Sequence, residues 1–190
     1  MPEITSLKVD MNKEKVVIVN ENDEVIGVEQ RQALIEKGLT HRIVRVMLLN
    51  SKGQVFLQKR SPNKDTWPTL WDQAIGGHVN EGEDYDDAVM REAKEELGID
   101  GVEFKRVIKF YTEDETGNGI KKRFNMLYEG VYDGELRLQD DEISEGRWFD
   151  FDEVERWINE KPSDFTPGFI KTFKKYKDAK AVSASRNLMI

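Results

Sequence analysis

Apolar and polar positions alternate near the N-terminus in the pattern of a β-hairpin followed by a short helix. We expect strands at 16–19 and 25–28, separated by a turn rich in Asn and Asp. Residues 30–37 have the spacing of a helix, and Gly38 is suited to cap it in the left-handed conformation. Because two strands alone are only marginally stable, we expect this hairpin to pack on the rest of the chain.

Further along, the pattern predicts a larger unit in which strands and helices are mixed. Apolar runs at 42–50 and 54–60 predict a second hairpin, and 61–83 is expected to be a loop with one buried stretch. Residues 84–97 have helical spacing and end at Gly98. Further strands are expected at 104–111, 123–132 and 146–149, and further helices at 151–159 and 166–177. This order predicts an α+β sandwich with helices on both faces of a sheet.

One main domain accounts for most of the 190 residues. We divide the chain into an N-terminal arm and hairpin extension at 1–39, a main domain at 40–178 and a mobile tail at 179–190. A chain of this length can bury about 70% of its surface on folding. One hydrophobic core is therefore sufficient.

Composition and charge exclude several kinds of site. The 29 Lys and Arg residues against 37 Asp and Glu give a net charge of −8, which disfavours general binding to nucleic acid or anionic membranes. The absence of cysteine excludes thiolate nucleophiles and Cys-ligated metals, and two histidines cannot form a three-His site. No segment has the ~20 apolar residues of a membrane span, and residues 1–10 lack a signal peptide's apolar core, so we expect a cytoplasmic protein.

The helix expected at 84–97 carries the most informative pattern. Residues 81–96 hold eight acidic side chains, and three of them, Glu92, Glu95 and Glu96, fall on one stripe of the helical wheel beside the apolar stripe. Clustered carboxylate oxygens suit Mg²⁺ or Mn²⁺. A solvated acidic face is the alternative for a generic helix of this composition.

Residues 77–99 resemble the Nudix box, whose spacing is G-x5-E-x7-R-E-U-x-E-E-x-G-U with U aliphatic. The seven fixed positions are filled by Gly77, Glu83, Arg91, Glu92, Glu95, Glu96 and Gly98. Ala93 and Ile99 fill the aliphatic positions. The chain is therefore identified as resembling the Nudix hydrolases, whose fold is an α/β/α sandwich with a mixed sheet; the hairpin at 1–39 would be an extension of it.

The resemblance implies roles for these residues. Glu92, Glu95 and Glu96 would ligate Mg²⁺, with Mn²⁺ as a substitute, together with the Gly77 carbonyl, and one glutamate would also activate water. Arg91 would orient the site by pairing with Glu83, and Gly98 would end the helix. The reaction implied is water attack on phosphorus in a small diphosphate compound, usually one linked to a nucleoside diphosphate. A homodimer is common in the family.

A narrower resemblance points to the branch that contains isopentenyl diphosphate isomerase. It rests on THRIVRVMLLNSKGQVFLQKRS, WPTLWD and GGHVNEGE. Members of that branch place a catalytic Cys where this chain has Gly76, a Glu-x-Glu pair where it has 121–123, and a metal-binding His where it has Leu34. His41 and His78 remain. We therefore expect an isomerase-like hydrolase; the alternatives are a prenyl diphosphate isomerase with a different acid and a catalytically silent nucleotide-binding module.

Candidate substrate and catalytic groups lie outside the box as well. Gln58 and Arg60 alternate on one strand and are candidates to face a diphosphate, although a plain exposed strand face explains them equally well. Arg45, Arg42 and the cations at 121–123 are candidates to reach phosphate, with a solvated edge as the alternative. His78 is a further substrate-binding candidate that a loop hydrogen bond would also explain. Glu142, just before a strand, is a candidate catalytic acid in this resemblance, with a polar turn as the alternative.

Overall fold

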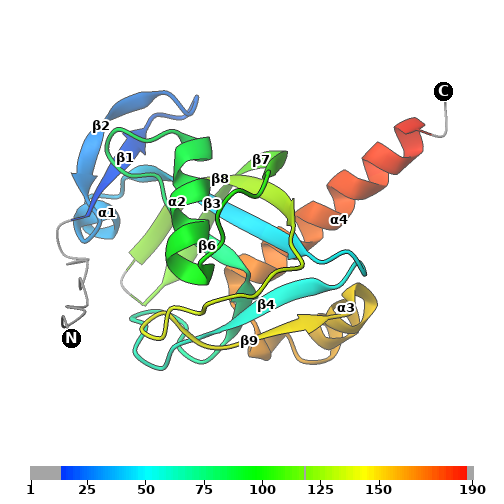
Figure 1. Cartoon of the computed structure of the whole chain (residues 1–190). Helices are drawn as coiled ribbons and strands as arrows, with labels where there is room; N and C mark the ends of the chain where they lie inside the picture. Colours follow the sequence, from blue (N-terminus) through cyan, green and yellow to red (C-terminus); the bar gives the residue numbers. More distant parts are fainter. Residues whose placement is uncertain (1–13, 118, 188–190) are drawn as a thin grey trace, which may run out of the picture.

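The computed structural model describes residues 14–117 and 119–187. The strands are β1 (Lys15–Val19), β2 (Val25–Gln30), β3 (Thr40–Leu49), β4 (Val55–Arg60), β5 (Trp71–Gln73), β6 (Ile75–His78), β7 (Lys105–Thr116), β8 (Gly119–Val131) and β9 (Ile143–Phe149). The helices are α1 (Ala33–Glu36), α2 (Tyr85–Leu97), α3 (Phe151–Glu160), the 3₁₀ turn η2 (Pro162–Asp164) and α4 (Pro167–Asn187) (Figure 1).

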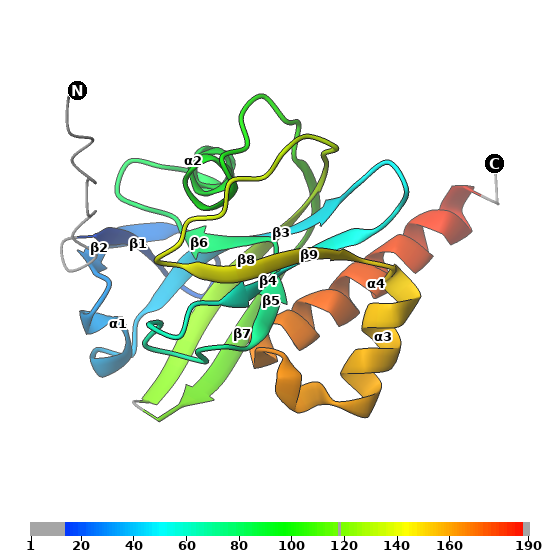
Figure 2. The ribbon, with the colours of Figure 1, turned by 60° about the horizontal axis from the view of Figure 1, so that its bottom comes forward.

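Helices cover both faces of the sheet. Figure 2 shows α2 on one side of the strands and α3 with α4 on the other. The alternation of side chains along β3 explains the two layers. Val44, Val46 and Leu48 belong to the apolar cluster under α2, whereas Met47 belongs to the cluster that includes Phe169 of α4. The predicted α/β/α sandwich is confirmed.

β3 lies at the centre of a mixed sheet. It pairs in parallel with β8 and antiparallel with β1 and β6. It pairs with β4 only at Leu49 and Val55, after which the two strands diverge. The segment 71–78 crosses the gap between them, because β5 pairs with β4 and β6 pairs with β3. This crossing places the glycines at the end of the segment, Gly76 and Gly77, beside α2.

The N-terminal hairpin forms as predicted. β1 and β2 pair antiparallel, and Leu34 of α1 packs with Val16 and Ile18 of β1. The helix expected at 30–37 is only one turn long, Ala33–Glu36, and Gly38 has the predicted left-handed conformation at φ +61°. The expected arm at 1–13 lies outside the described residues.

Three segments differ from the sequence-based expectation. The stretch 61–83 is not a loop throughout, because it contains β5 and β6. The strands expected at 104–111 and 123–132 are extended toward each other into the long hairpin of β7 and β8. The helix expected to end at 177 continues to Asn187, so residues 179–187 are part of α4 and not a separate tail. Within the described residues, no helix has both the length and the apolarity needed to cross a membrane.

Candidate active site

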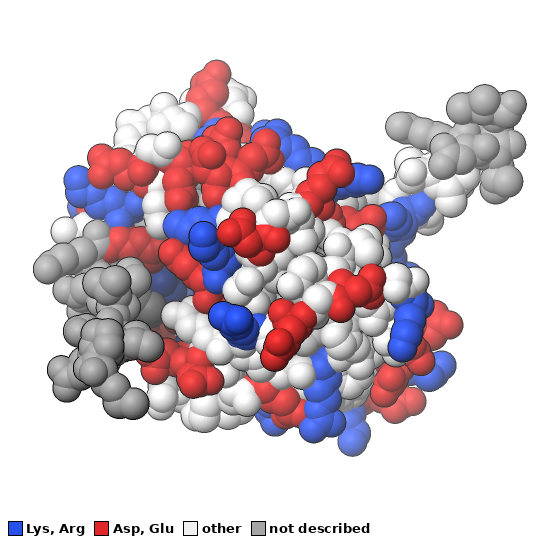
Figure 3. Space-filling model, viewed as in Figure 1, with Lys and Arg blue, Asp and Glu red and all other residues white. Residues whose placement is uncertain are grey.

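The helix α2 has strong signals at both ends. Asp84 caps its N-terminus by accepting hydrogen bonds from the backbone of Asp86 and Asp87, and the Asp87 side chain bonds back to the Asp84 amide. Gly98 ends it in the left-handed conformation at φ +67°. Acidic side chains gather over the N-terminal part of this helix (Figure 3), where the helix dipole favours negative charge.

The three glutamates of the carboxylate stripe differ in burial. Glu92 is 8% exposed and Glu96 is 7% exposed, whereas the Glu95 side chain is 50% exposed. Glu92 and Glu96 are one turn apart, and their neighbours Ala93 and Leu97 lie in the core under α2. Two of the three carboxylates are therefore held between the helix and the sheet.

Glu92 lies directly against the backbone of β6. A Cβ atom added at Gly77 would lie 1.9 Å from its Oε1 atom, so only glycine fits there while the carboxylate keeps this position. Burial raises the pKa of Glu92 to about 7, with the nearby charge of Glu95 adding to the effect against the lowering by Arg91. The carboxylate is thus poised between its protonated and ionised forms near neutral pH.

Glu96 occupies the next turn and contacts the other glycine of β6. Its Oε2 accepts a 3.0 Å hydrogen bond from Gln58 of β4, and the Gly76 amide lies 3.5 Å from its Oε1. Burial raises the pKa of Glu96 well above its usual value, and the charges of Glu92 and Glu142 raise it further. Burial and the neighbouring charge of Glu92 therefore both disfavour ionisation of Glu96.

Arg91 connects the helix to the loop before it. Its Nε and Nη2 atoms donate to both oxygens of Glu83 at 2.6 and 2.9 Å, which is the pairing expected from the sequence. Nη2 also donates to the His78 carbonyl, and Nη1 donates to Glu92 and Glu95 at 2.7 and 3.1 Å. These contacts hold the pKa of Glu83 below its usual value despite partial burial. One guanidinium thus fixes the loop, the strand and two glutamates together.

Glu142 approaches the same carboxylates from the loop before β9. It forms an ion pair with Lys64, and its charge contributes to the raised pKa of Glu96. The Ser61 amide donates to the Glu142 carbonyl at 2.9 Å, so the loop after β4 is tied to this segment. Lys64 was not among the residues predicted from the sequence, since an isolated lysine in a polar loop carries no pattern of its own.

The other predicted substrate-binding residues are engaged in contacts within the protein. Gln58 uses its amide to hold Glu96. Arg60 donates to the carbonyls of Thr66 and Trp67, in the loop that follows its own strand. His78 has its ring stacked on His41 at 5.2 Å between centroids, away from Glu92.

Two arginines of β3 project to opposite faces. Arg42 pairs with Asp23 on the α2 side, so it has a structural contact there rather than a free guanidinium. Arg45 is buried on the other face, where it donates to Asn125 and Gln73 at 2.9 Å each. The structure therefore gathers Glu92, Glu96, Gln58, Arg91, Glu83 and Glu142 in one place and puts Arg45 and His78 across the sheet.

The residues predicted to bind metal are engaged in hydrogen bonds with neighbouring side chains. The described residues contain no group of three or more His, Asp or Glu side chains placed to hold a metal ion. The reason is visible in the contacts: Glu92 and Glu95 both accept from Arg91, and Glu96 accepts from Gln58. The donor chemistry fits a hard divalent cation, because the site offers several carboxylate oxygens and Glu96, although buried, pairs with the neutral amide of Gln58 and with no described cation.

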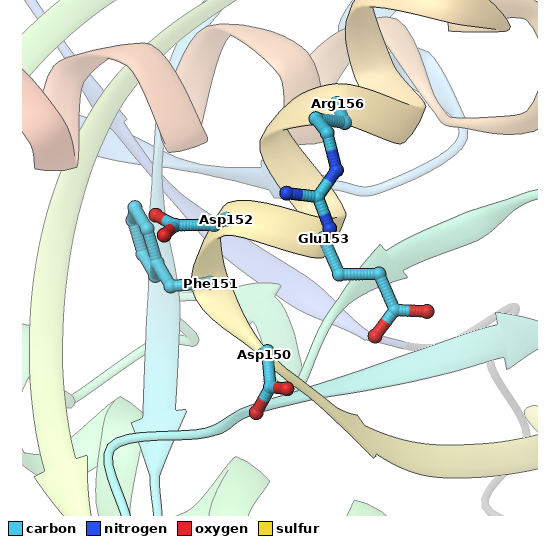
Figure 4. A pocket seen from close by; sticks show the side chains of 5 residues that line it. All are labelled: Asp150, Phe151, Asp152, Glu153 and Arg156. Carbon is cyan, nitrogen blue, oxygen red and sulfur yellow. The ribbon is translucent and has the colours of Figure 1, made fainter.

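Two hollows of the described surface lie away from these glutamates. One, of 360 Å³, is lined by Asp150, Phe151, Asp152, Glu153 and Arg156. Figure 4 shows that these side chains come from one end of α3 and do not converge on a common point. Another, of 300 Å³, lies between α4 and the β3–β4 turn, beside Leu49 and Tyr176. No predicted site residue lines either hollow.

Comparison with known proteins gives a consistent family. A family model described as the NUDIX domain matches residues 39–169. An uncharacterised Nudix hydrolase of Pseudomonas aeruginosa is 36% identical over 167 residues, which is 87% of this chain and 95% of that protein. The uncharacterised Nudix hydrolase YfcD of Escherichia coli is 35% identical over 158 residues, 83% of each chain. An isopentenyl-diphosphate Delta-isomerase of Aromatoleum aromaticum is 27% identical over 155 residues, covering 81% of this chain and 82% of that one.

Solved structures agree. The crystal structure of DR0079 from Deinococcus radiodurans has a TM-score of 0.64 and 29% identity, over 77% of this chain and 90% of that chain. The NUDIX domain of Shewanella oneidensis NrtR, solved in complex with ADP ribose, has a TM-score of 0.57 over 72% of this chain and 86% of that chain, and at 14% identity it shows the shared fold alone. The family model, the relatives and the intact box at 77–99 agree, and the chain belongs to the Nudix hydrolases, a family that acts on diphosphate bonds.

Proposed function

We propose that this chain is a Mg²⁺-dependent pyrophosphohydrolase that cleaves the diphosphate of a small, nucleoside diphosphate-linked compound by water attack on phosphorus. The observation that carries the proposal is the buried pair of carboxylates, Glu92 and Glu96, against the side-chain-free backbone of Gly76 and Gly77. Two neighbouring carboxylates whose pKa values are both raised by burial form a site that a cation would stabilise.

The box residues would have different roles according to their positions. Glu92, Glu96 and the Gly77 carbonyl would hold the cation, and Glu95, which is half exposed at the edge of the pair, would accept the proton of the attacking water. A bound divalent cation offsets phosphate charge and lowers the pKa of water. Mn²⁺ would substitute for Mg²⁺, because both prefer oxygen ligands.

Contacts around these glutamates set their orientation. Arg91 holds Glu92 and Glu95 from one side, and Gln58 holds Glu96 from the other. Binding of the cation would require Glu92 to exchange part of its contact with Arg91, while the Arg91–Glu83 pair keeps the guanidinium in place. Lys64 forms an ion pair with Glu142, whose charge raises the pKa of Glu96, so we assign Lys64 to substrate phosphate and Glu142 to proton transfer.

A substrate panel tests the proposal. Nucleoside diphosphate sugars, dinucleoside polyphosphates and ADP-ribose would be incubated with and without Mg²⁺; ADP-ribose belongs in the panel because a NUDIX domain of the same fold was solved with it. We expect Mg²⁺-dependent turnover of at least one compound. Glu96→Gln should abolish most of it, whereas Glu103→Gln, the same change at an exposed glutamate, should leave it intact. Carrying out the reaction in H₂¹⁸O would identify the phosphorus attacked.

The same samples separate the two alternatives. Deuterium incorporation into isopentenyl diphosphate in D₂O would favour an isomerase, although the chain lacks a cysteine and has cations at Lys121 and Arg123. Calorimetric binding of a panel compound without hydrolysis would favour a silent binding module. Either result, in the absence of Mg²⁺-dependent hydrolysis, would overturn the proposal.

A further inference from the structure

Cations gather on the face of the sheet opposite the box glutamates. The parallel register of β3 and β8 sets His41 beside Arg123, and Arg45 on the same face reaches Asn125 of β8. Lys121 is two residues before Arg123 and so lies on that face as well. Arg31, in the turn before α1, and Arg60, at the end of β4, lie close enough for their charges to lower the pKa of Lys121. We call Arg31, Arg45, Arg60, Lys121 and Arg123 the cationic cluster.

The cationic cluster has more positive than negative charge. Three carboxylates face it: Glu14 pairs with Arg31, Asp72 lies 3.5 Å from Arg60, and Asp114 pairs with Arg123. Asp114 also pairs with Lys171 of α4. Six cations, the cluster and Lys171, therefore stand against three carboxylates. The excess is notable in a chain whose net charge is −8.

Three members of the cluster lack full partners. Among the described residues, buried Arg45 donates to two neutral side chains, those of Asn125 and Gln73, and to no carboxylate. Lys121 lies over the Trp67 ring at 5.3 Å and forms no ion pair with any described carboxylate. Arg123 is buried, and its Nε atom has no hydrogen-bond partner among the described residues. A buried donor without a partner is unfavourable unless something else accepts from it.

The cations also oppose one another. Burial lowers the pKa of Lys121 to about 8, and the charges of Arg123, Arg31 and Arg60 lower it further. Burial and the charge of Arg123 lower the pKa of Arg45 to about 10. This repulsion would be relieved by an anion placed among the cluster side chains.

The cluster and the glutamates are separated by a single strand. The amide of Gly76 in β6 points toward Glu96. A Cβ atom added at Gly76 would touch the side chain of Gln73, which accepts a hydrogen bond from Arg45. Among the described strands, β6 pairs only with β3, so its second edge is not covered by another strand. A ligand could therefore contact both groups of residues around that edge.

We infer that the cationic cluster binds a phosphate group, through charge-assisted hydrogen bonds from guanidinium and ammonium donors to its oxygens. The chemistry suits a phosphate monoester or inorganic phosphate. If the bound group is the terminal phosphate of a substrate, the substrate must carry a phosphate separate from the diphosphate that is cleaved. This first source rests on the proposed function and deepens it. As free phosphate, the group would be an effector bound behind the catalytic glutamates.

Calorimetry on the full chain tests the site without reference to hydrolysis. Inorganic phosphate would be titrated into metal-free protein at constant ionic strength. We expect saturable binding that Lys121→Gln weakens by about tenfold to a hundredfold. Lys122→Gln is the matched control, because it removes the same charge from the adjacent residue, which lies on the opposite face of β8 and forms no ion pair in the described structure. No binding by the unmodified chain, or equal weakening in both variants, would overturn the inference.

Initial rates with Mg²⁺ distinguish the two sources. If the phosphate belongs to the substrate, free phosphate will compete and raise KM for a compound with an extra phosphate monoester, and Lys121→Gln will remove the preference for that compound. If it is an effector, free phosphate will change kcat for compounds with and without the monoester alike. Phosphate binding that persists when no compound is hydrolysed would contradict the proposed function alone.

Discussion

Gly77 of β6 packs so closely against the carboxylate of Glu92 in α2 that there is no room for a side chain at Gly77. A methyl group at Gly77 would lie 1.9 Å from the Cδ and Oε1 atoms of Glu92. Gly77, the first fixed residue of the box, therefore leaves space for the side chain of Glu92, fifteen positions later in the chain. The contact explains why glycine is needed at a position whose backbone is an ordinary extended strand.

Gly77→Ala should displace Glu92 while the strand itself remains possible. We expect hydrolysis to fall by about a hundredfold, because a shift of about 1 Å in a catalytic group has effects of that size. Overpacking should also lower the free energy of unfolding by about 1–3 kcal/mol. The control is Gly27→Ala in β2, where an added Cβ meets no atom within 4 Å. Equal activity of the two variants would show that Glu92 can move without consequence.

Arg91→Lys should weaken the site although it keeps the positive charge. A lysine cannot reproduce the two parallel hydrogen bonds to Glu83 together with those to Glu92 and the His78 carbonyl. We expect turnover to fall by about tenfold or more and the free energy of unfolding by about 1–3 kcal/mol. Arg106→Lys, at an exposed pair with Asp86, should change stability by less than about 1 kcal/mol. Comparable losses in denaturant titrations of both variants would refute a special role for Arg91.

Acid should destabilise the fold through His41. Burial and the charge of Arg123 lower its pKa from 6.5 to about 3, so between these values the unfolded chain binds a proton that the folded chain does not. Stability from this residue is complete above pH 6.5 and is lost as the pH falls toward 3. Between pH 7 and pH 5 the loss should be about 2 kcal/mol. His41→Gln should reduce the pH slope of the unfolding free energy by that amount, and an unchanged slope would contradict the buried, neutral state.

The helix α2 and its site could be predicted because their signals are local. Asp84 and Gly98 mark its ends, and the spacing of Glu92, Glu95 and Glu96 is a property of the helix alone. The helical wheel could not predict burial, because all three residues of the carboxylate stripe are glutamates. The sheet covers Glu92 and Glu96 and leaves the Glu95 side chain half exposed. The contact of Gln58 with Glu96 spans 38 positions and depends on where β4 diverges from β3.

Long-range pairing also explains the segments that the pattern missed. β5 and β6 are three and four residues long and cross between two strands, so neither shows an alternating pattern of its own. The polar ends of β7 and β8 have the sequence pattern of a loop. The contact that joins them, the ion pair of Asp114 with Arg123 across the hairpin, is visible only in the structure. The last turns of α4 are made of small and polar residues, several of them alanines with high helix propensity, that have no apolar face to reveal the helix.

The central claim is that Glu92 and Glu96 are buried together in order to hold a divalent cation. The most direct test measures Mn²⁺ binding by electron paramagnetic resonance, and unfolding temperature in EDTA, for the unmodified chain and for the Glu92→Gln, Glu96→Gln double variant. We predict that the double variant loses Mn²⁺ binding yet unfolds at a higher temperature, because two carboxylates whose ionisation is disfavoured by burial have been replaced by neutral amides. Unchanged Mn²⁺ affinity in the double variant would contradict the account.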